Sequence, residues 1–205
     1  MGRNVNTYPG CACDIPGAFY SFSFDPHPGS MLFTPQKEIR SYLRQVSAKY
    51  GVTSHILFRT SFMAATWNEE VNDWSLKLED LSTHTVYYES VDILILAIGG
   101  LVNPKPFEVP GVQNFLGPIF HSSNWRHDVS LRNKKVIVVG NGCSGSQLIP
   151  AVLNETNSVT QFIRSPQWYI RTSNFKYPNW AKILFKYVPG SMWLWRFVCS
   201  QTIRG

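Results

Sequence analysis

A glycine loop at residues 140–145 constrains the fold of this chain more than any other feature of the sequence. The loop follows directly after the apolar run Val136–Val139, whose length and β-branched residues predict a buried parallel strand. The residues that follow, 144–153, predict a helix. A strand, G-x-G-x-x-G and a helix in this order are typical of a dinucleotide-binding fold.

Each glycine of the loop has its own physical role in such a fold. Gly140 allows the tight turn, Gly142 lets the backbone approach a pyrophosphate, and Gly145 lets helix and strand pack closely. The amides at the start of the helix and the helix dipole then favour bound phosphates. We therefore predict a nucleotide site made of Gly140, Asn141, Gly142, Cys143, Ser144, Gly145 and Ser146.

The end of the next predicted strand indicates which nucleotide binds. Residues 159–163 form an apolar run that ends at Arg164 and Ser165, about 20 residues past the loop. An acidic residue at this place favours NAD, whereas a basic one accommodates the 2′-phosphate of NADP. The Arg164 guanidinium can hold phosphate in a bidentate manner, with help from the Ser165 hydroxyl. The sequence therefore favours NADP over NAD.

Composition excludes several other classes of protein. With 44% hydrophobic and 16% charged residues among 205, the chain is not disordered. The net charge of +6 comes from scattered Lys and Arg residues without zinc spacing or an RNA-binding motif, so we expect no nucleic-acid partner. Four cysteines, including the C-x-C pair Cys11 and Cys13, form neither a disulfide framework nor a metal site, and no signal peptide is visible. We expect a cytoplasmic protein without a metal.

The remaining pattern outlines the other elements. A helix is predicted from a Thr34 cap to Tyr50, and a small antiparallel sheet at about 55–90, with a hairpin around 67–78. The run Val91–Ala97 predicts a strand buried on both faces. The aromatic run at 183–199 is too interrupted to span a membrane. We expect a helix of the buried kind that has lost its partner, with peripheral membrane contact as the alternative.

Four ordered motifs resemble the type I Baeyer–Villiger monooxygenases of the flavin-containing monooxygenase superfamily. The pattern Phe115-x-Gly117-x-x-x-His121-x-x-x-Trp125 is similar to the family fingerprint that precedes the second glycine loop. Residues Tyr8–Pro16 with Tyr20–Phe24 resemble the family's segment beside the flavin ring. Leu96–Gly100 resembles its Ala-Thr-Gly strand end, and Arg164–Pro166 resembles its contact to the 2′-phosphate.

The resemblance implies an oxygenase that uses FAD, NADPH and O₂ on a ketone or a soft heteroatom compound. It implies that Asp14 lies near the flavin and controls the charge of a catalytic arginine, and that His121 couples domain rotation to turnover. It also implies a Tyr20 contact to the flavin, a backbone contact of Phe62 to its adenine, and contacts of Ala12, Cys13 and Asp14 to FAD or NADP.

The sequence departs from the family pattern at three places: Arg126 stands where Pro or Asp is usual, Ile98 replaces a threonine, and Ala12 replaces an arginine. The FAD glycine loop and the catalytic arginine are expected outside residues 1–205. We therefore expect an α/β, Rossmann-like flavoprotein with two dinucleotide-binding domains, truncated at both ends. Residues 1–133 would be a partial FAD domain and 134–205 a partial NADP domain. Two alternatives remain: a non-catalytic NADP-binding remnant or interaction protein, and a heteroatom or amine oxygenase.

Overall fold

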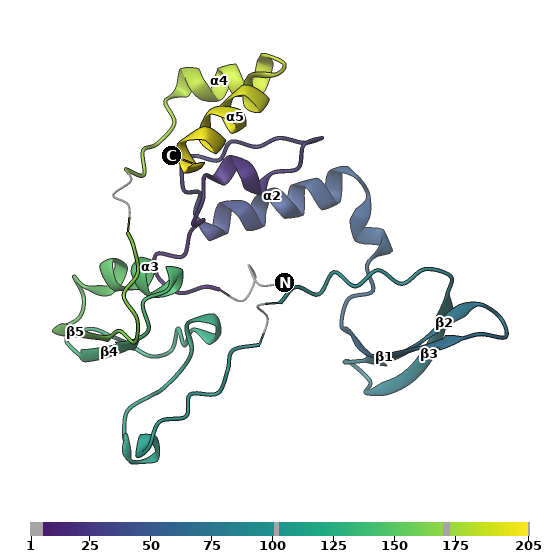
Figure 1. Ribbon diagram of the computed structural model, residues 1–205, viewed down its shortest axis with the longest axis horizontal. Coiled ribbons are helices and arrows are strands. Elements are labelled where there is room, and N and C mark those ends of the chain that lie inside the picture. Colours follow the sequence, from purple (N-terminus) through teal and green to yellow (C-terminus); the bar gives the residue numbers. More distant parts are fainter. Residues whose placement is uncertain (1–5, 101–102, 170–172, 205) are drawn as a thin grey trace. The chain divides into compact units, whose positions relative to one another are not determined.

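The computed structural model describes residues 6–100, 103–169 and 173–204. The chain forms two compact units, Met1–Val46 with Leu101–Gly205 (unit 1) and Ser47–Gly100 (unit 2). The boundary falls within the last turn of helix α2 (Gln36–Lys49). Figure 1 shows that the helices α3, α4 and α5 and the parallel strands belong to unit 1, whereas the antiparallel sheet makes up most of unit 2.

Unit 1 contains the predicted strand–loop–helix–strand arrangement. Strand β4 (Lys135–Val139) leads into helix α3 (Cys143–Val152), and β5 (Ser158–Phe162) returns to pair with β4 in parallel. Alternate residues of each strand are half-buried, as in a sheet that is covered on one face. The α/β fold predicted from the glycine loop is confirmed.

Helix α2 is amphipathic in the predicted way. Ile39, Tyr42 and Val46 are buried at helical spacing. The predicted cap is wrong, because the Thr34 hydroxyl donates to the carbonyl of Met31 and the helix begins at Gln36. Thr34 is almost fully buried, and this burial explains why its hydroxyl bonds inward to the preceding turn.

Unit 2 is a three-stranded antiparallel sheet. Strands β1 (Thr60–Asn68), β2 (Asp73–Asp80) and β3 (Thr85–Val91) pair in sequence order. A bulge interrupts β1 between Phe62 and Ala64, and an edge-to-face pair of tryptophans closes the first hairpin. The predicted antiparallel sheet and its hairpin are confirmed.

The predicted buried strand at Val91–Ala97 is wrong. Strand β3 ends at Val91, and the residues that follow are non-helical and exposed, with Ile95 82% accessible. A strand buried on both faces needs neighbours to take up its backbone hydrogen bonds. Among the described residues no strand pairs with this run, and periodicity alone could not reveal that.

The apolar run at 183–199 divides into two helices, α4 (Asn179–Tyr187) and α5 (Ser191–Arg204), separated at Pro189 and Gly190. On their inner sides, Phe185 of α4 and Trp195 of α5 pack with Tyr177. Phe175 extends this ring cluster by its edge-to-face contact with Tyr177. Large apolar side chains on the other sides are exposed, and both the lost partner and the membrane contact stay predictions. Within the part of the chain that is described, none of the helices is long and apolar enough to cross a bilayer.

The N-terminal segment of unit 1 lies directly against helix α3. Tyr8, Leu148 and Val152 form a buried cluster, and Trp125 and Val159 pack around it. At Gly10, which has a φ of +78°, a Cβ atom would lie 2.4 Å from the carbonyl oxygen of Gln147 and 2.9 Å from the Cβ of Ala151. Only glycine allows this approach of the two backbones.

We expect Gly10→Ala to lower the free energy of unfolding by about 2–4 kcal/mol, because it adds both a positive-φ strain and an overpacked contact. Gly190→Ala is the matched control, since Gly190 has a φ of +80° and nothing within 4 Å of its added Cβ. The control should cost only about 1 kcal/mol. Urea unfolding measures both; equal losses for the two variants would contradict the close approach.

Candidate functional site

The three loop glycines differ in their surroundings as their predicted roles require. Gly140 has a φ of +108°, and a Cβ atom at Gly140 or Gly142 would meet nothing within 4 Å. At Gly145 an added Cβ would lie 3.0 Å from the carbonyl oxygen of Gly140. The first two glycines therefore leave open space beside the backbone, whereas the third brings helix α3 against the end of β4.

The start of helix α3 carries amides free of any side-chain cap. Gly142 occupies the N-cap position and no side chain caps the helix there. The first helical hydrogen bond runs from the Ser146 amide to the Gly142 carbonyl, at 3.1 Å. The amides of Cys143, Ser144 and Gly145 precede it, as donors at the positive end of the helix dipole. This is the arrangement that binds anionic phosphate.

A surface pocket of about 470 Å³ lies beside the loop and the end of β5. It is lined by Val139, Gly140, Asn141, Phe162, Ile163, Arg164, Ser165 and Gln167. Arg164 and Ser165 are exposed there. The pocket thus brings together the glycine loop and the pair predicted to select NADP.

Asn141 holds the loop and the end of β5 together. Its side chain is buried, and its Nδ2 donates to the Ser165 carbonyl at 3.0 Å. The Tyr169 hydroxyl donates to the Asn141 carbonyl at 2.5 Å. Asn141 therefore positions the pocket's two walls, and its side-chain amide is already engaged within the protein.

Ala12 and Cys13 lie between helix α3 and the loop before α2. The Gln147 side chain accepts from the Ala12 amide and donates to the Ala12 carbonyl, both at 3.3 Å. The Cys13 amide donates to the Thr34 carbonyl, at 3.0 Å. These contacts bring residues predicted beside the cofactors onto the same helix that begins at the glycine loop.

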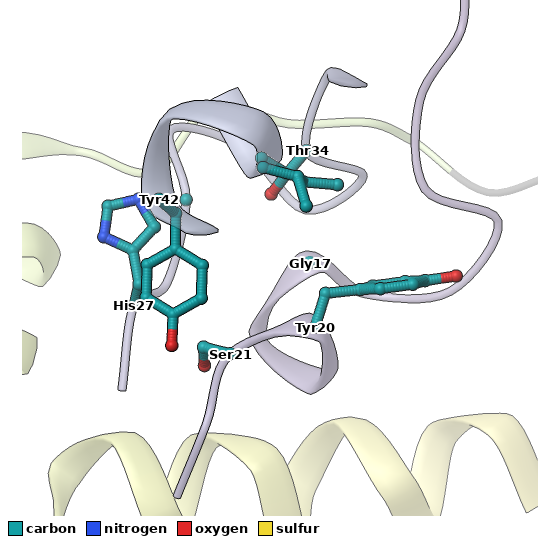
Figure 2. Close-up of a pocket in the computed structure, with 8 residues that line it drawn as sticks. Gly17, Tyr20, Ser21, His27, Thr34 and Tyr42 are labelled. Atoms are coloured by element: carbon teal, nitrogen blue, oxygen red, sulfur yellow. The ribbon is translucent and has the colours of Figure 1, made fainter. Parts of the chain in front are cut away.

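Asp14 and Tyr20 are joined directly, because the Tyr20 hydroxyl donates to the Asp14 carboxylate at 2.6 Å. Figure 2 shows Tyr20 directed away from His27 and Tyr42, whose rings are stacked. The cavity between these side chains measures only about 10 Å³ and cannot admit a substrate. Tyr20 is one of the residues that line this small cavity.

The described contacts of His121 and Phe62 do not involve the glycine loop. His121 is exposed and caps a short turn, η4 (Ser122–Asn124), by accepting from the Ser123 amide at its Nδ1. Its described bonds are therefore local. Trp125, four residues on, packs edge-to-face with Phe120 and against the Tyr8 cluster. Phe62 lies in unit 2, at the β1 bulge, with 45% of its side chain exposed.

Sequence reasoning missed Gln147 and Tyr169. Gln147 bonds to both Ala12 and the Tyr8 hydroxyl, which donates to its Oε1 at 2.9 Å. No spacing rule links a helix glutamine with a loop 135 positions earlier. The only signal in the sequence was its position, because Gln147 lies one turn after Cys143 on the predicted helix that follows the loop. The structure shows that its side chain is half-buried.

The chain resembles flavin monooxygenases in both sequence and structure. Residues 16–192 match the model of the flavin-binding monooxygenase-like family. An uncharacterized monooxygenase of Sinorhizobium fredii is 36% identical over 96% of this chain and 30% of its own length. A Baeyer–Villiger monooxygenase of Streptomyces coelicolor is 35% identical over 80% of this chain and 30% of its own length.

Among solved structures, a cyclohexanone monooxygenase mutant from Rhodococcus sp. Phi1, bound to NADP⁺, superposes with a TM-score of 0.80. It is 27% identical and is matched over 92% of this chain and 36% of its own chain. The sequence thus spans about a third of the length of these relatives. The fold is that of flavoproteins with two dinucleotide-binding domains.

Burial beside helix α3 gives a pH dependence that can be tested. It raises the pKa of Tyr8 to about 12, against an ordinary value near 10. Between these values the native state holds a proton that the unfolded state has lost, so the free energy of unfolding falls as pH rises. We expect Tyr8→Phe to remove this part of the decline, and Tyr88→Phe, at an exposed tyrosine, to leave it.

Urea unfolding from about pH 9 to about pH 12 measures the dependence. If the wild type, Tyr8→Phe and Tyr88→Phe all decline in parallel over that range, Tyr8 is not buried as a neutral phenol.

Proposed function

Because this chain belongs to the flavin-binding monooxygenase-like family, we propose that it forms the NADPH-binding portion of an FAD-dependent monooxygenase. One observation carries the proposal: Gly140 and Asn141, which lead into the uncapped start of helix α3, line the same pocket as the exposed pair Arg164 and Ser165. The amides at 143–145 would hold the pyrophosphate, and Arg164 with Ser165 the 2′-phosphate. The structural relative bound to NADP⁺ supports this assignment.

The residues near Asp14 fit a role beside FAD. The Asp14 carboxylate is exposed and keeps acceptor capacity beyond the bond from Tyr20, so the pair can orient a polar ring edge. We assign Ala12, Cys13 and Asp14 to contacts with FAD or NADP and Tyr20 to a contact with the flavin. Phe62 is assigned to a contact with the adenine of FAD. Bound FAD, reduced by NADPH, would supply the oxygenating chemistry with O₂. His121 is assigned a part in domain coupling.

The substrate we propose is a ketone or a soft heteroatom compound. The Baeyer–Villiger relative and the fingerprint Trp125 support ketone oxygenation, and a heteroatom or amine oxygenase is the alternative within the family. We propose residues 1–133 as part of the FAD domain and 134–205 as part of the NADP domain. None of the four described cysteines is in a disulfide, and we propose a reducing, cytoplasmic location.

A second candidate function is nucleotide binding without catalysis. The nucleotide pocket is made entirely of residues from one short stretch of unit 1, whereas the chain spans about a third of its relatives' length. We therefore assign NADPH binding to this chain itself. Oxygenation is proposed for a protein with the full length of these relatives.

Arg164→Ala should weaken NADPH binding at least about tenfold, because it removes a charge-assisted contact to the 2′-phosphate, and it should leave NADH binding unchanged. Titration calorimetry with both nucleotides measures this. Arg132→Ala, at another exposed arginine, is the matched control and should bind both normally. Equal weakening by the two variants, or an equal loss for NADH, would contradict the role of Arg164.

The 205-residue chain should bind NADPH but show no ketone-dependent NADPH oxidation when supplied with excess FAD. The physical reason is that the residues described here provide one glycine loop and therefore one pyrophosphate site. Absorbance at the NADPH band with cyclohexanone or a thioether measures the rate. Substrate-dependent turnover would overturn the division of roles, and absence of nucleotide binding would overturn the proposed function.

A further inference from the structure

The net positive charge of this chain comes from its last quarter. Residues 156–205 contain seven Lys and Arg residues and no Asp or Glu, whereas residues 1–155 contain twelve basic and thirteen acidic residues. The seven are Arg164, Arg171, Lys176, Lys182, Lys186, Arg196 and Arg204. A stretch with this balance attracts anionic partners and has no acidic group to oppose them.

Helix α4 presents an apolar stripe to solvent. Trp180, Ile183, Leu184 and Tyr187 follow the i, i+3, i+4, i+7 spacing of one helix face, and all four are exposed, Trp180 by 70%. Ala181, on the neighbouring side of the helix, is buried. Helix α4 therefore has a buried side that faces the protein and a second apolar side that faces solvent.

Helix α5 repeats the pattern. Trp193, Leu194, Phe197 and Val198 are exposed, while Met192 and Cys199 are buried on the inner side. The rings of Trp193 and Phe197 stack, with 6.2 Å between their centroids. Figure 1 shows α4 and α5 as a helical hairpin, and the two helices contact each other.

Cationic groups border this apolar surface. Lys186 is exposed and its Nζ lies 5.0 Å from the centre of the Tyr187 ring, while Lys182 is half-buried one turn earlier. Arg196 is tied inward, because its guanidinium donates to the Ser21 carbonyl at 2.8 Å. The inner side of the hairpin is thus fixed to the N-terminal segment at Ser21, and its outer side carries lysines and aromatic rings.

We propose that the α4–α5 hairpin docks on an anionic lipid surface. Exposed Trp and Tyr beside Lys is the chemistry of a helix that lies in the bilayer interface, with rings at the headgroup level and ammonium groups on lipid phosphates. The charge balance favours this occupant over a second copy of the chain, because two hairpins of the same positive charge repel each other. Neither helix crosses the bilayer. The proposal does not depend on nucleotide binding.

Vesicle flotation tests the proposal on the 205-residue chain, with phosphatidylcholine vesicles and with vesicles that contain about 30% phosphatidylglycerol. We expect binding to the anionic vesicles at about 0.1 M salt, and its loss at about 0.5 M, since screening removes the attraction. Lys182→Glu with Lys186→Glu should weaken that binding by a factor of about ten or more. The matched control is Lys134→Glu with Lys135→Glu, which makes the same charge change outside the hairpin.

The contribution of the exposed rings to vesicle binding is tested by the double variant Trp193→Ser with Phe197→Ser. The control is Ile93→Ser with Ile95→Ser, which changes two exposed residues of unit 2. Only the first pair should release the chain from anionic vesicles, with circular dichroism unchanged in both. Three results would overturn the proposal: no vesicle binding, equal effects of the hairpin and control variants, or light scattering that shows a dimer abolished by Trp193→Ser with Phe197→Ser.

Discussion

The contact between the N-terminal segment and helix α3 is the constraint on which the rest of unit 1 depends. Gly10 lets the two backbones approach, and the Gln147 amide bonds both the Tyr8 hydroxyl and the Ala12 backbone. Gln147 lies on the helix that begins at the glycine loop. A single side chain therefore ties residues assigned to the flavin side to the element assigned to the nucleotide phosphates.

The nucleotide pocket depends on a second set of fixed backbone groups. The buried Asn141 joins the loop to the end of β5 through the Ser165 carbonyl, and Gly145 brings helix α3 against the carbonyl of Gly140. Both contacts are made between groups of the protein itself. Because these contacts fix the loop, its amides can bind phosphate with a smaller loss of conformational entropy.

Among the parts of the chain with exposed apolar side chains, two differ clearly in chemistry. The run after β3 is aliphatic, and no described strand pairs with it. The α4–α5 hairpin carries aromatic rings and lysines and is fixed to the loop at Ser21 through Arg196. An aliphatic run in extended conformation needs a neighbouring strand to pair with, whereas aromatic rings beside ammonium groups are suited to the membrane–water interface. This difference is why only the hairpin is assigned to a lipid surface.

The sequence by itself determined the local elements around the glycine loop, because the loop, the flanking apolar periodicity and the position of Arg164 are all short-range patterns. It also determined the family, which the match over residues 16–192 shows. It failed at Val91–Ala97 and missed Gln147, since a buried strand and a bridging amide are each defined by partners distant in sequence. Only the tertiary structure decided which residues meet around helix α3, which side of the hairpin is buried, and that His121 caps a local turn. The physical reason is that burial and hydrogen bonding belong to pairs of groups in space, whereas a sequence pattern describes one element at a time.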